Sequence, residues 1–189
     1  MLSRVRLVGR SLWHRLRFAG RRICIHPTAK VSRRSVLRTN GGGSITIGAH
    51  CEIHEFAMIL TYGGDITIGD HCSLNPFSIV YGHGGTRIGN GVRIAAHTVI
   101  IPANHQRTRS GGGQLAGMRT EGITIGDDVW IACGCQILDG VVIGRHSTIG
   151  AGSVVTRSIP ENVVAVGVPA RPLSVTRSMT ENVPDAGLG

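Results

Sequence analysis

Aliphatic residues recur at every sixth position over long stretches of the chain, and this repeat is the main pattern in the sequence. The longest uninterrupted series is Ile125, Ile131, Ile137, Ile143, Ile149 and Val155. Shorter series with the same spacing begin at Ile47, Ile68 and Ile88. The position four residues after each aliphatic carries a small or β-branched side chain, as at Cys51, Ala57, Cys72, Ser78, Val92, Thr98, Val129, Cys135, Val141, Ser147 and Ser153.

A period of six residues, with a small side chain four positions after each aliphatic, has a specific structural meaning. Each hexad forms a short strand and a tight turn, with the aliphatic and the small residue pointing inward. Three hexads close one triangular coil, and successive coils stack about 4.8 Å apart. The sequence therefore predicts an all-β chain of stacked coils, in which Cys51, Cys72 and Cys135 are small core residues rather than redox groups.

The pattern resembles that of the hexapeptide-repeat proteins, whose fold is a left-handed parallel β-helix; the handedness is implied by the resemblance alone. We expect this domain over residues 41–173, and the resemblance itself covers 44–173. The repeat breaks once, at residues 105–122, which contain many glycines and no hexad. A long irregular segment inside a compact repeat is usually functional or disordered, so we expect a loop extruded from one corner of the coil.

The positive charge is concentrated at the N-terminus. The net charge is +9, yet eleven Arg and Lys residues precede the first acidic residue, Glu52, so the remainder is close to neutral. Residues 1–40 are predicted to be a basic segment containing an amphipathic helix over 2–19. Two interpretations stay open: peripheral contact of residues 1–22 with an anionic membrane surface, or a helix that caps the first coil. Residues 174–189 have no period and are expected to form a flexible tail.

Charge and cysteine content also exclude some classes of protein. A nucleic-acid-binding domain needs a basic face on the fold itself, and the repeat region has none. No stretch approaches the roughly 20 apolar residues of a membrane-spanning helix. The five cysteines are an odd number, and arginines interrupt every apolar run near the N-terminus. We therefore expect a reducing compartment and a cytoplasmic location, which is membrane-peripheral if residues 1–22 contact a membrane.

Three local motifs resemble the acyl-CoA-dependent O-acetyltransferases of this fold. They lie at residues 123–144, at 149–160 and in Val-Gly-Val-Pro-Ala-Arg at 166–171. Two further segments, Tyr-Gly-His-Gly-Gly at 81–85 and the stretch 93–105, are similar to the acetyltransferases of capsule and lipopolysaccharide synthesis. The resemblance implies acetyl-CoA as co-substrate, a sugar or glycan acceptor, and a homotrimer with active sites between subunits.

The resemblance also assigns catalytic roles. His105, which opens the irregular loop, matches the general base that deprotonates the acceptor hydroxyl, a role worth about 10²–10⁴-fold in rate. Asn75 matches a residue that holds the acceptor hydroxyl or the histidine. His97 is a weaker candidate. Since no Asp or Glu lies between Asp70 and Glu121, a carboxylate that orients His105 must come from elsewhere, unless a backbone carbonyl does so.

Residues for coenzyme A follow from the same resemblance, and they are Trp130, Cys133, Ala151, Thr156, Arg157 and Arg171. Cys133 and Ala151 match positions whose backbone lines the pantetheine channel, whereas Arg157 and Arg171 offer cations to the phosphates. A backbone N–H of the 131–134 turn is the expected donor to the oxyanion. Two departures are noted: Ala132 stands where glycine is usual, and Ser174 where a basic residue is common.

Two alternative functions are kept. One is a non-catalytic β-helix scaffold, since a fold does not fix a function. The other is a carbonic anhydrase of the gamma type, which holds zinc with three histidines on the same fold. The chain has nine histidines but lacks the paired-histidine spacing of that site, so no metal is expected.

Overall fold

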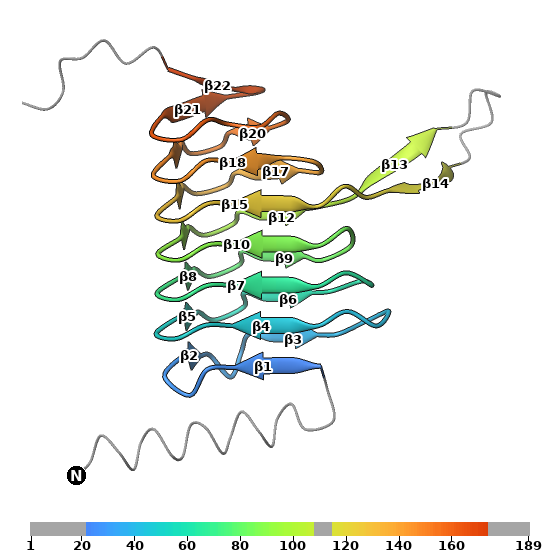
Figure 1. Cartoon of the computed structure of the whole chain (residues 1–189), viewed down its shortest axis with the longest axis vertical. Helices are drawn as coiled ribbons and strands as arrows, with labels where there is room; N and C mark the ends of the chain where they lie inside the picture. The colour runs from blue at the N-terminus through green and yellow to red at the C-terminus, as the bar shows by residue number, and fades with distance from the viewer. Residues whose placement is uncertain (1–21, 108–114, 174–189) are drawn as a thin grey trace, which may run out of the picture.

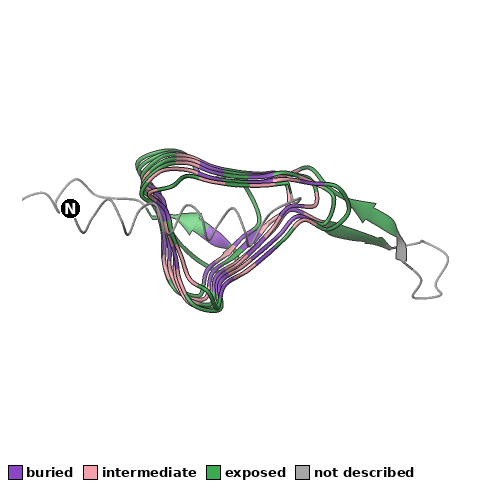
Figure 2. Ribbon diagram, turned by 90° about the horizontal axis from the view of Figure 1, so that it is seen from below, coloured by how far each residue is buried: buried purple, intermediate pink, exposed green. Residues whose placement is uncertain are grey.

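The described part of the chain is a triangular prism of stacked β-strand coils (Figures 1 and 2). In this computed structural model, residues 22–107 and 115–173 are described. Three parallel sheets, here called A, B and C, form the walls. Because the chain passes through them in the order A, B, C in each coil, it turns at three corners, which we call the A/B, B/C and C/A corners.

The strands of each wall are short and are hydrogen-bonded coil to coil. Sheet A contains β1 (Ile23–Ile25), β4 (Ile45–Ile47), β7 (Ile66–Ile68), β10 (Thr86–Ile88), β15 (Ile123–Ile125) and β18 (Val142–Ile143). Sheet B contains β2 (Lys30–Val31), β5 (Glu52–Ile53), β8 (Ser73–Leu74), β11 (Arg93–Ile94), β16 (Trp130–Ile131), β19 (Thr148–Ile149), β21 (Val164–Gly167) and β22 (Ala170–Pro172). Sheet C contains β3 (Val36–Arg38), β6 (Met58–Leu60), β9 (Ile79–Tyr81), β12 (Val99–Ile101), β17 (Gln136–Leu138) and β20 (Val154–Val155).

The interior of the prism is filled by the residues of the hexad repeat. The aliphatic positions, for example Ile94 and Ile131, are completely buried. The small positions are buried as well, and the thiols of Cys51, Cys72 and Cys135 donate to backbone carbonyl oxygens at 2.9, 3.0 and 3.2 Å. Burial raises the pKa of the Cys135 thiol, which disfavours the reactive thiolate. The interpretation of these cysteines as core residues is confirmed.

The β-helix begins earlier in the sequence than predicted. Strands β1, β2 and β3 form a complete first coil over residues 23–38, so the domain boundary placed between residues 40 and 41 is wrong. The hexad signal is present in this region, because Ile25, Val31 and Leu37 are six residues apart. Five of the eleven basic residues that suggested a separate segment lie in or next to this coil, and they are Arg22, Lys30, Arg33, Arg34 and Arg38.

The irregular segment is a hairpin that projects from the C/A corner (Figures 1 and 2). Its strands β13 (Asn104–Arg107) and β14 (Leu115–Arg119) pair in antiparallel fashion, with His105 opposite Met118. At its base, the Asp139 carboxylate accepts hydrogen bonds from the backbone N–H groups of Glu121 and Gly122 at 2.8 and 3.0 Å. The extruded loop of the prediction is therefore confirmed, with a regular base.

The C-terminal end of the prism departs from the purely parallel pattern. At the C-terminal end, β21 and β22 pair in antiparallel fashion and add to sheet B. The predicted helix over residues 2–19 and the tail over 174–189 lie outside the described residues. In the described part of the chain, no helix is long and apolar enough to span a membrane.

Candidate functional site

The predicted catalytic base lies at the C/A corner. His105 is exposed on strand β13, next to the point where the hairpin leaves the prism. Within the described residues, no hydrogen bond or ion pair holds its ring. His83 lies in the same region. Burial lowers the pKa of His83, the charge of His105 lowers it further, and the charge of Asp139 raises it. His83 therefore lies within range of the charges of both His105 and Asp139.

Asp139 is a carboxylate at the same corner of the prism as His105. It follows strand β17, so it comes from outside the acid-free window between Asp70 and Glu121. Its oxygens accept from the backbone of residues 121 and 122 rather than from an imidazole. Asp139 thus fixes the hairpin and contributes a negative charge to the corner, and the structure shows no hydrogen bond between it and His105 in the described region.

Asn75 lies at a different corner of the prism. It follows β8 of sheet B and precedes β9 of sheet C, so it occupies the B/C corner. Its side-chain amide donates to the carbonyl oxygen of Ile94 at 3.0 Å, which ties it to the next coil. His97 belongs to this corner too, where its ring stacks on Phe77 at 5.1 Å. Within one chain, all of sheet C therefore separates Asn75 and His97 from His105.

The predicted pantetheine-lining residues share the B/C corner with Asn75. Cys133 and Ala151 follow β16 and β19 in consecutive coils, and the Cys133 carbonyl accepts from the N–H of Gly152 at 2.9 Å. Among the described residues, the backbone N–H groups of Cys133 and Ala151 have no acceptor, whereas those of Ala132 and Gly134 do. The Cys133 N–H thus fits the expected oxyanion donor in the 131–134 turn.

This corner also has room for a ligand. A column of rings formed by Phe56, Phe77 and His97 runs along it, with adjacent centroids 5.1 Å apart. The next two coils have Gly134 and Gly152 at this corner, and a Cβ atom added to either would meet nothing within 4 Å. The ring column therefore ends at His97, and the space beyond it is open beside Cys133 and Ala151.

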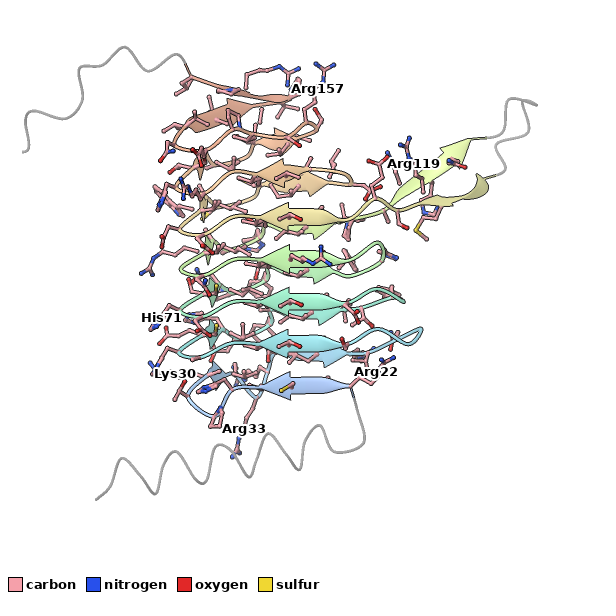
Figure 3. The ribbon with its side chains drawn as sticks, in the orientation of Figure 1. Arg22, Lys30, Arg33, His71, Arg119 and Arg157 are labelled. Carbon is pink, nitrogen blue, oxygen red and sulfur yellow. The ribbon has the colours of Figure 1, made fainter. Side chains whose placement is uncertain are left out.

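The remaining predicted residues lie on outer surfaces near the C-terminal end. Trp130 is 53% exposed on the outer face of sheet B, between Arg93 and Thr148 in register. Thr156 and Arg157 are exposed after β20 (Figure 3). Arg171 is exposed on β22, where its guanidinium donates to the Ala170 carbonyl at 2.8 Å. The two arginines place positive charge near the last coils.

Sequence reasoning missed a group of aromatic side chains beside His105. Tyr62, Tyr81 and His83 lie at the C/A corner, and the rings of Tyr62 and His83 stack at 5.0 Å. The signal that could have found them is the spacing of one coil: Tyr62 and His83 are 21 residues apart, as are Phe56 and Phe77. Equal spacing of this kind places side chains in one column.

In residues 22–107 and 115–173, no group of three or more His, Cys, Asp or Glu side chains comes together in a way that could hold a metal ion. The zinc site of the carbonic anhydrase alternative therefore has no ligand set in this part of the chain.

Comparison with known proteins identifies what the coils resemble. Residues 122–157 match the family described as bacterial transferase hexapeptide (six repeats). The chain is 44% identical to the galactoside O-acetyltransferase of Escherichia coli over 88 residues, which are 44% of this chain and 41% of that protein. It is 40% identical to the galactoside O-acetyltransferase of Lactococcus lactis over 85 residues, 43% of this chain and 39% of that protein. The matched stretches thus span about two fifths of these relatives.

Solved structures support the fold over most of the chain. A hexapeptide-repeat acetyltransferase from Vibrio cholerae, in complex with acetyl-CoA, superimposes with a TM-score of 0.55 and 29% identity, covering 88% of this chain and 75% of that one. AntD, an N-acyltransferase from Bacillus cereus, superimposes with a TM-score of 0.71 and 24% identity, covering 85% and 87% of the two chains. The left-handed parallel β-helix of hexapeptide repeats is confirmed.

Proposed function

We propose that this hexapeptide-repeat protein is an acetyltransferase that moves an acetyl group from acetyl-CoA to a hydroxyl of a sugar or glycan, with His105 as the general base. The observation that carries the proposal is the position of His105, exposed and without a hydrogen-bond partner in the described chain, at the base of the hairpin. The relatives named galactoside O-acetyltransferase support a sugar acceptor, and the hexapeptide match includes Trp130 and Cys133.

The proposed reaction needs one proton acceptor and one oxyanion donor. Acetyl-CoA supplies the acetyl group as a thioester. The His105 imidazole takes the proton of the acceptor hydroxyl, because a neutral hydroxyl is a poor nucleophile. The oxygen forms a bond to the thioester carbonyl carbon, and the Cys133 N–H stabilises the negative charge that develops on the carbonyl oxygen. The C–S bond then breaks, and the proton on His105 passes to the departing thiolate.

The B/C corner fits the pantetheine arm of coenzyme A. The open space at Gly134 and Gly152 accommodates a narrow chain, and the N–H group of Ala151 is available to one of its amide oxygens. Trp130 provides an exposed ring on the adjoining wall. Arg157, Thr156 and Arg171 lie toward the C-terminal end, where their donors and charges suit the phosphates.

We further propose a homotrimer with an active site between adjacent subunits. One chain carries His105 at the C/A corner and Asn75 with Cys133 at the B/C corner, and sheet C lies between them. Catalysis requires the base and the thioester to be within a few ångströms of each other. A cyclic assembly meets this requirement when the C/A corner of one subunit faces the B/C corner of the next. Each site then takes residues from two copies.

We also propose a cytoplasmic location, with peripheral contact between residues 1–22 and a membrane surface. The support is the sequence of residues 1–22, which is rich in arginine and contains no acidic residue. Such a segment is attracted to anionic lipids.

The first test compares wild-type protein with His105→Ala and His105→Gln. Release of the coenzyme A thiol would be followed with acetyl-CoA and a panel of galactosides and oligosaccharides. We expect transfer to fall by about 10²–10⁴-fold in both variants, with coenzyme A binding and the unfolding temperature unchanged. His71→Ala is the matched control, because His71 is an exposed histidine that also lies at a corner, away from the hairpin (Figure 3).

Two outcomes would contradict the proposal. Full transfer by a folded His105→Ala protein would remove the mechanism. Absence of coenzyme A binding by the wild-type protein would favour the non-catalytic scaffold.

A further inference from the structure

The C/A corner carries a cluster of aromatic rings that the proposed chemistry does not use. It consists of Tyr62, Tyr81 and His83, and it includes both tyrosines of the chain. The Tyr62 and His83 rings are stacked, with centroids 5.0 Å apart and planes 8° from parallel. The Tyr81 ring is tilted against both, at 5.7 and 5.8 Å. Three rings therefore gather on the outside of the prism, away from its aliphatic core.

The core does not account for this cluster. Tyr62 is 46% exposed, and its backbone adopts a φ of +46°, in the left-handed region that a tyrosine rarely occupies. Within the described chain, none of the three side chains has a hydrogen-bond partner for its polar atoms. Rings such as tyrosine and histidine combine a flat apolar face with a polar edge, and they bind well to ligands that combine the same features.

A polar hollow of about 580 Å³ adjoins the cluster, and His83 lines both. The other polar residues of its wall include Asp65, Thr67, Arg87, Glu121 and Thr124. A volume of this size is in the range of small-molecule sites. Hydroxyl, carboxylate and guanidinium groups side by side provide both donors and acceptors, which suits a ligand with several hydroxyl groups.

At the C/A corner, the positions of Tyr62 and His83 lie one above the other, in the direction of the coil that carries His105. In sheet C, Leu60 is in register with Tyr81 and Val80 with Ile100. Continuing this register outward places Tyr62, His83 and Ala103 above one another, and His105 follows two residues after Ala103. Coils are stacked about 4.8 Å apart, so Tyr62 lies roughly 10 Å below the coil from which the hairpin departs. This separation suits two successive sugar units of a glycan, one at Tyr62 and one at His105.

From this arrangement we infer that Tyr62, Tyr81, His83 and the adjoining hollow form a glycan-binding subsite, which holds a second sugar unit of the acceptor while a hydroxyl of the first lies at His105. The inference rests on the proposed function for its first sugar unit, but binding at the rings stands by itself. It assigns the acceptor to oligosaccharides rather than monosaccharides. The apolar face of the second ring packs on the aromatic group, and its hydroxyls face Asp65, Arg87 and Glu121.

The chain offers a closely matched control for a test. His50 belongs to the same coil as Tyr62, is exposed, has a φ of +55° and stacks on His71 at 5.0 Å, but it lies at the A/B corner, away from both corners of the proposed site. Tyr62→Gly and His50→Gly both remove an exposed stacked ring, and glycine accepts a positive φ without strain. Both variants are therefore expected to fold, which thermal unfolding would check.

Binding would be measured by titration calorimetry on the full chain, without acetyl-CoA. The probes are mono-, di- and tetrasaccharides of galactose, glucose and N-acetylglucosamine, with UDP-galactose and UDP as a separate arm. We expect at least one di- or tetrasaccharide to bind more tightly than its monosaccharide. We also expect Tyr62→Gly to weaken that binding about tenfold, His83→Ala to weaken it too, and His50→Gly to leave it unchanged.

The probes distinguish a free glycan from a nucleotide-linked sugar, and they test the subsite separately from the transferase activity. Tyr62-dependent binding of UDP-galactose but not of UDP would assign the subsite to a nucleotide-linked sugar, with the ring still on the aromatic group. Equal binding by wild type and Tyr62→Gly, or no binding of any probe, would overturn the inference. Tyr62-dependent glycan binding without thiol release in the presence of acetyl-CoA would retain the subsite and reject the transferase.

Discussion

The B/C and C/A corners of the prism are made by the same chain in the same coils, yet they differ in regularity. At the B/C corner the inward aliphatic positions are always six residues apart, as from Ile53 to Ile59 and from Ile131 to Ile137. At the C/A corner the corresponding spacing is nine residues from Ile59 to Ile68, eight from Val80 to Ile88, and 25 from Ile100 to Ile125. All the inserted residues of these coils are therefore at one corner.

This difference shows how a repeat protein can add side chains to its surface without disturbing its core. The regular corner supplies a continuous wall with open backbone N–H groups and space beyond His97. The irregular corner supplies side chains that the core does not need, namely the Tyr62, Tyr81 and His83 cluster and the hairpin with His105. Loops can vary without disturbing the buried hexads, because they lie outside the stacked strands.

The largest expected effect tests whether the two corners act together across subunits. His105→Ala and Asn75→Ala proteins are each expected to lose most transfer activity. Random mixed trimers made from equal amounts of the two should recover about a quarter of the wild-type activity, since one site in four combines an intact His105 with an intact Asn75. Thiol release after denaturing and refolding the mixture would measure this recovery.

A mixture that gives only the sum of the two separate variants would contradict the shared site. Refolded wild-type protein, treated in parallel, provides the reference activity.

The next effect concerns sheet B, the wall that leads into the B/C corner. Ile131 and Trp130 are neighbours on β16, but Ile131 is buried and Trp130 is exposed. Ile131→Ala is expected to lower the free energy of unfolding by about 2–5 kcal/mol, because it leaves a cavity between coils. Trp130→Ala should change it by about 0.5 kcal/mol or less while weakening coenzyme A binding. Denaturant unfolding and titration with coenzyme A would measure the two, and a large stability loss in Trp130→Ala would contradict its proposed role.

A smaller effect is expected at the base of the hairpin. Asp139→Ala removes the acceptor for the N–H groups of Glu121 and Gly122, and this should cost about 1 kcal/mol of stability. Transfer should fall about tenfold, because His105 would be held less firmly. Asp127→Ala is the control: it removes a similar acceptor for the Asn90 N–H, 2.7 Å away, at the A/B corner. Equal activity loss in both variants would contradict a specific role of the hairpin base.

The smallest effect is a pH dependence from His83. Burial and the charge of His105 hold the pKa of His83 below its ordinary value of 6.5, so the unfolded chain binds more protons than the folded one in the window below pH 6.5. Stability from this group should therefore be complete above pH 6.5 and be lost as the pH falls through the folded pKa. Denaturant unfolding between pH 5 and 7.5 would measure the free energy of unfolding at each pH. This free energy should change less with pH in His83→Gln than in wild type, and an identical pH dependence would contradict the placement of His83.

Most of the fold could be predicted from the sequence because the repeat is local. An aliphatic residue at every sixth position specifies the strand, the turn and the inward face within a few residues, as at Ile125 to Val155. The first coil was missed although Ile25, Val31 and Leu37 follow the same rule, because basic residues between them suggested a separate segment. The identity of His105 and Asn75 as candidates came from motifs, but their separation came only from the structure.

The sequence by itself therefore determined the coil, its buried residues and the place where the hairpin interrupts it, since each depends on spacing within one coil. Only the tertiary structure decided which distant residues share a corner. Tyr62 reaches His83, and Cys133 reaches Ala151, because coils of unequal length are brought into register by hydrogen bonds between strands. The number of residues inserted at each corner sets that register, and the pairing of the strands decides which side chains then lie side by side.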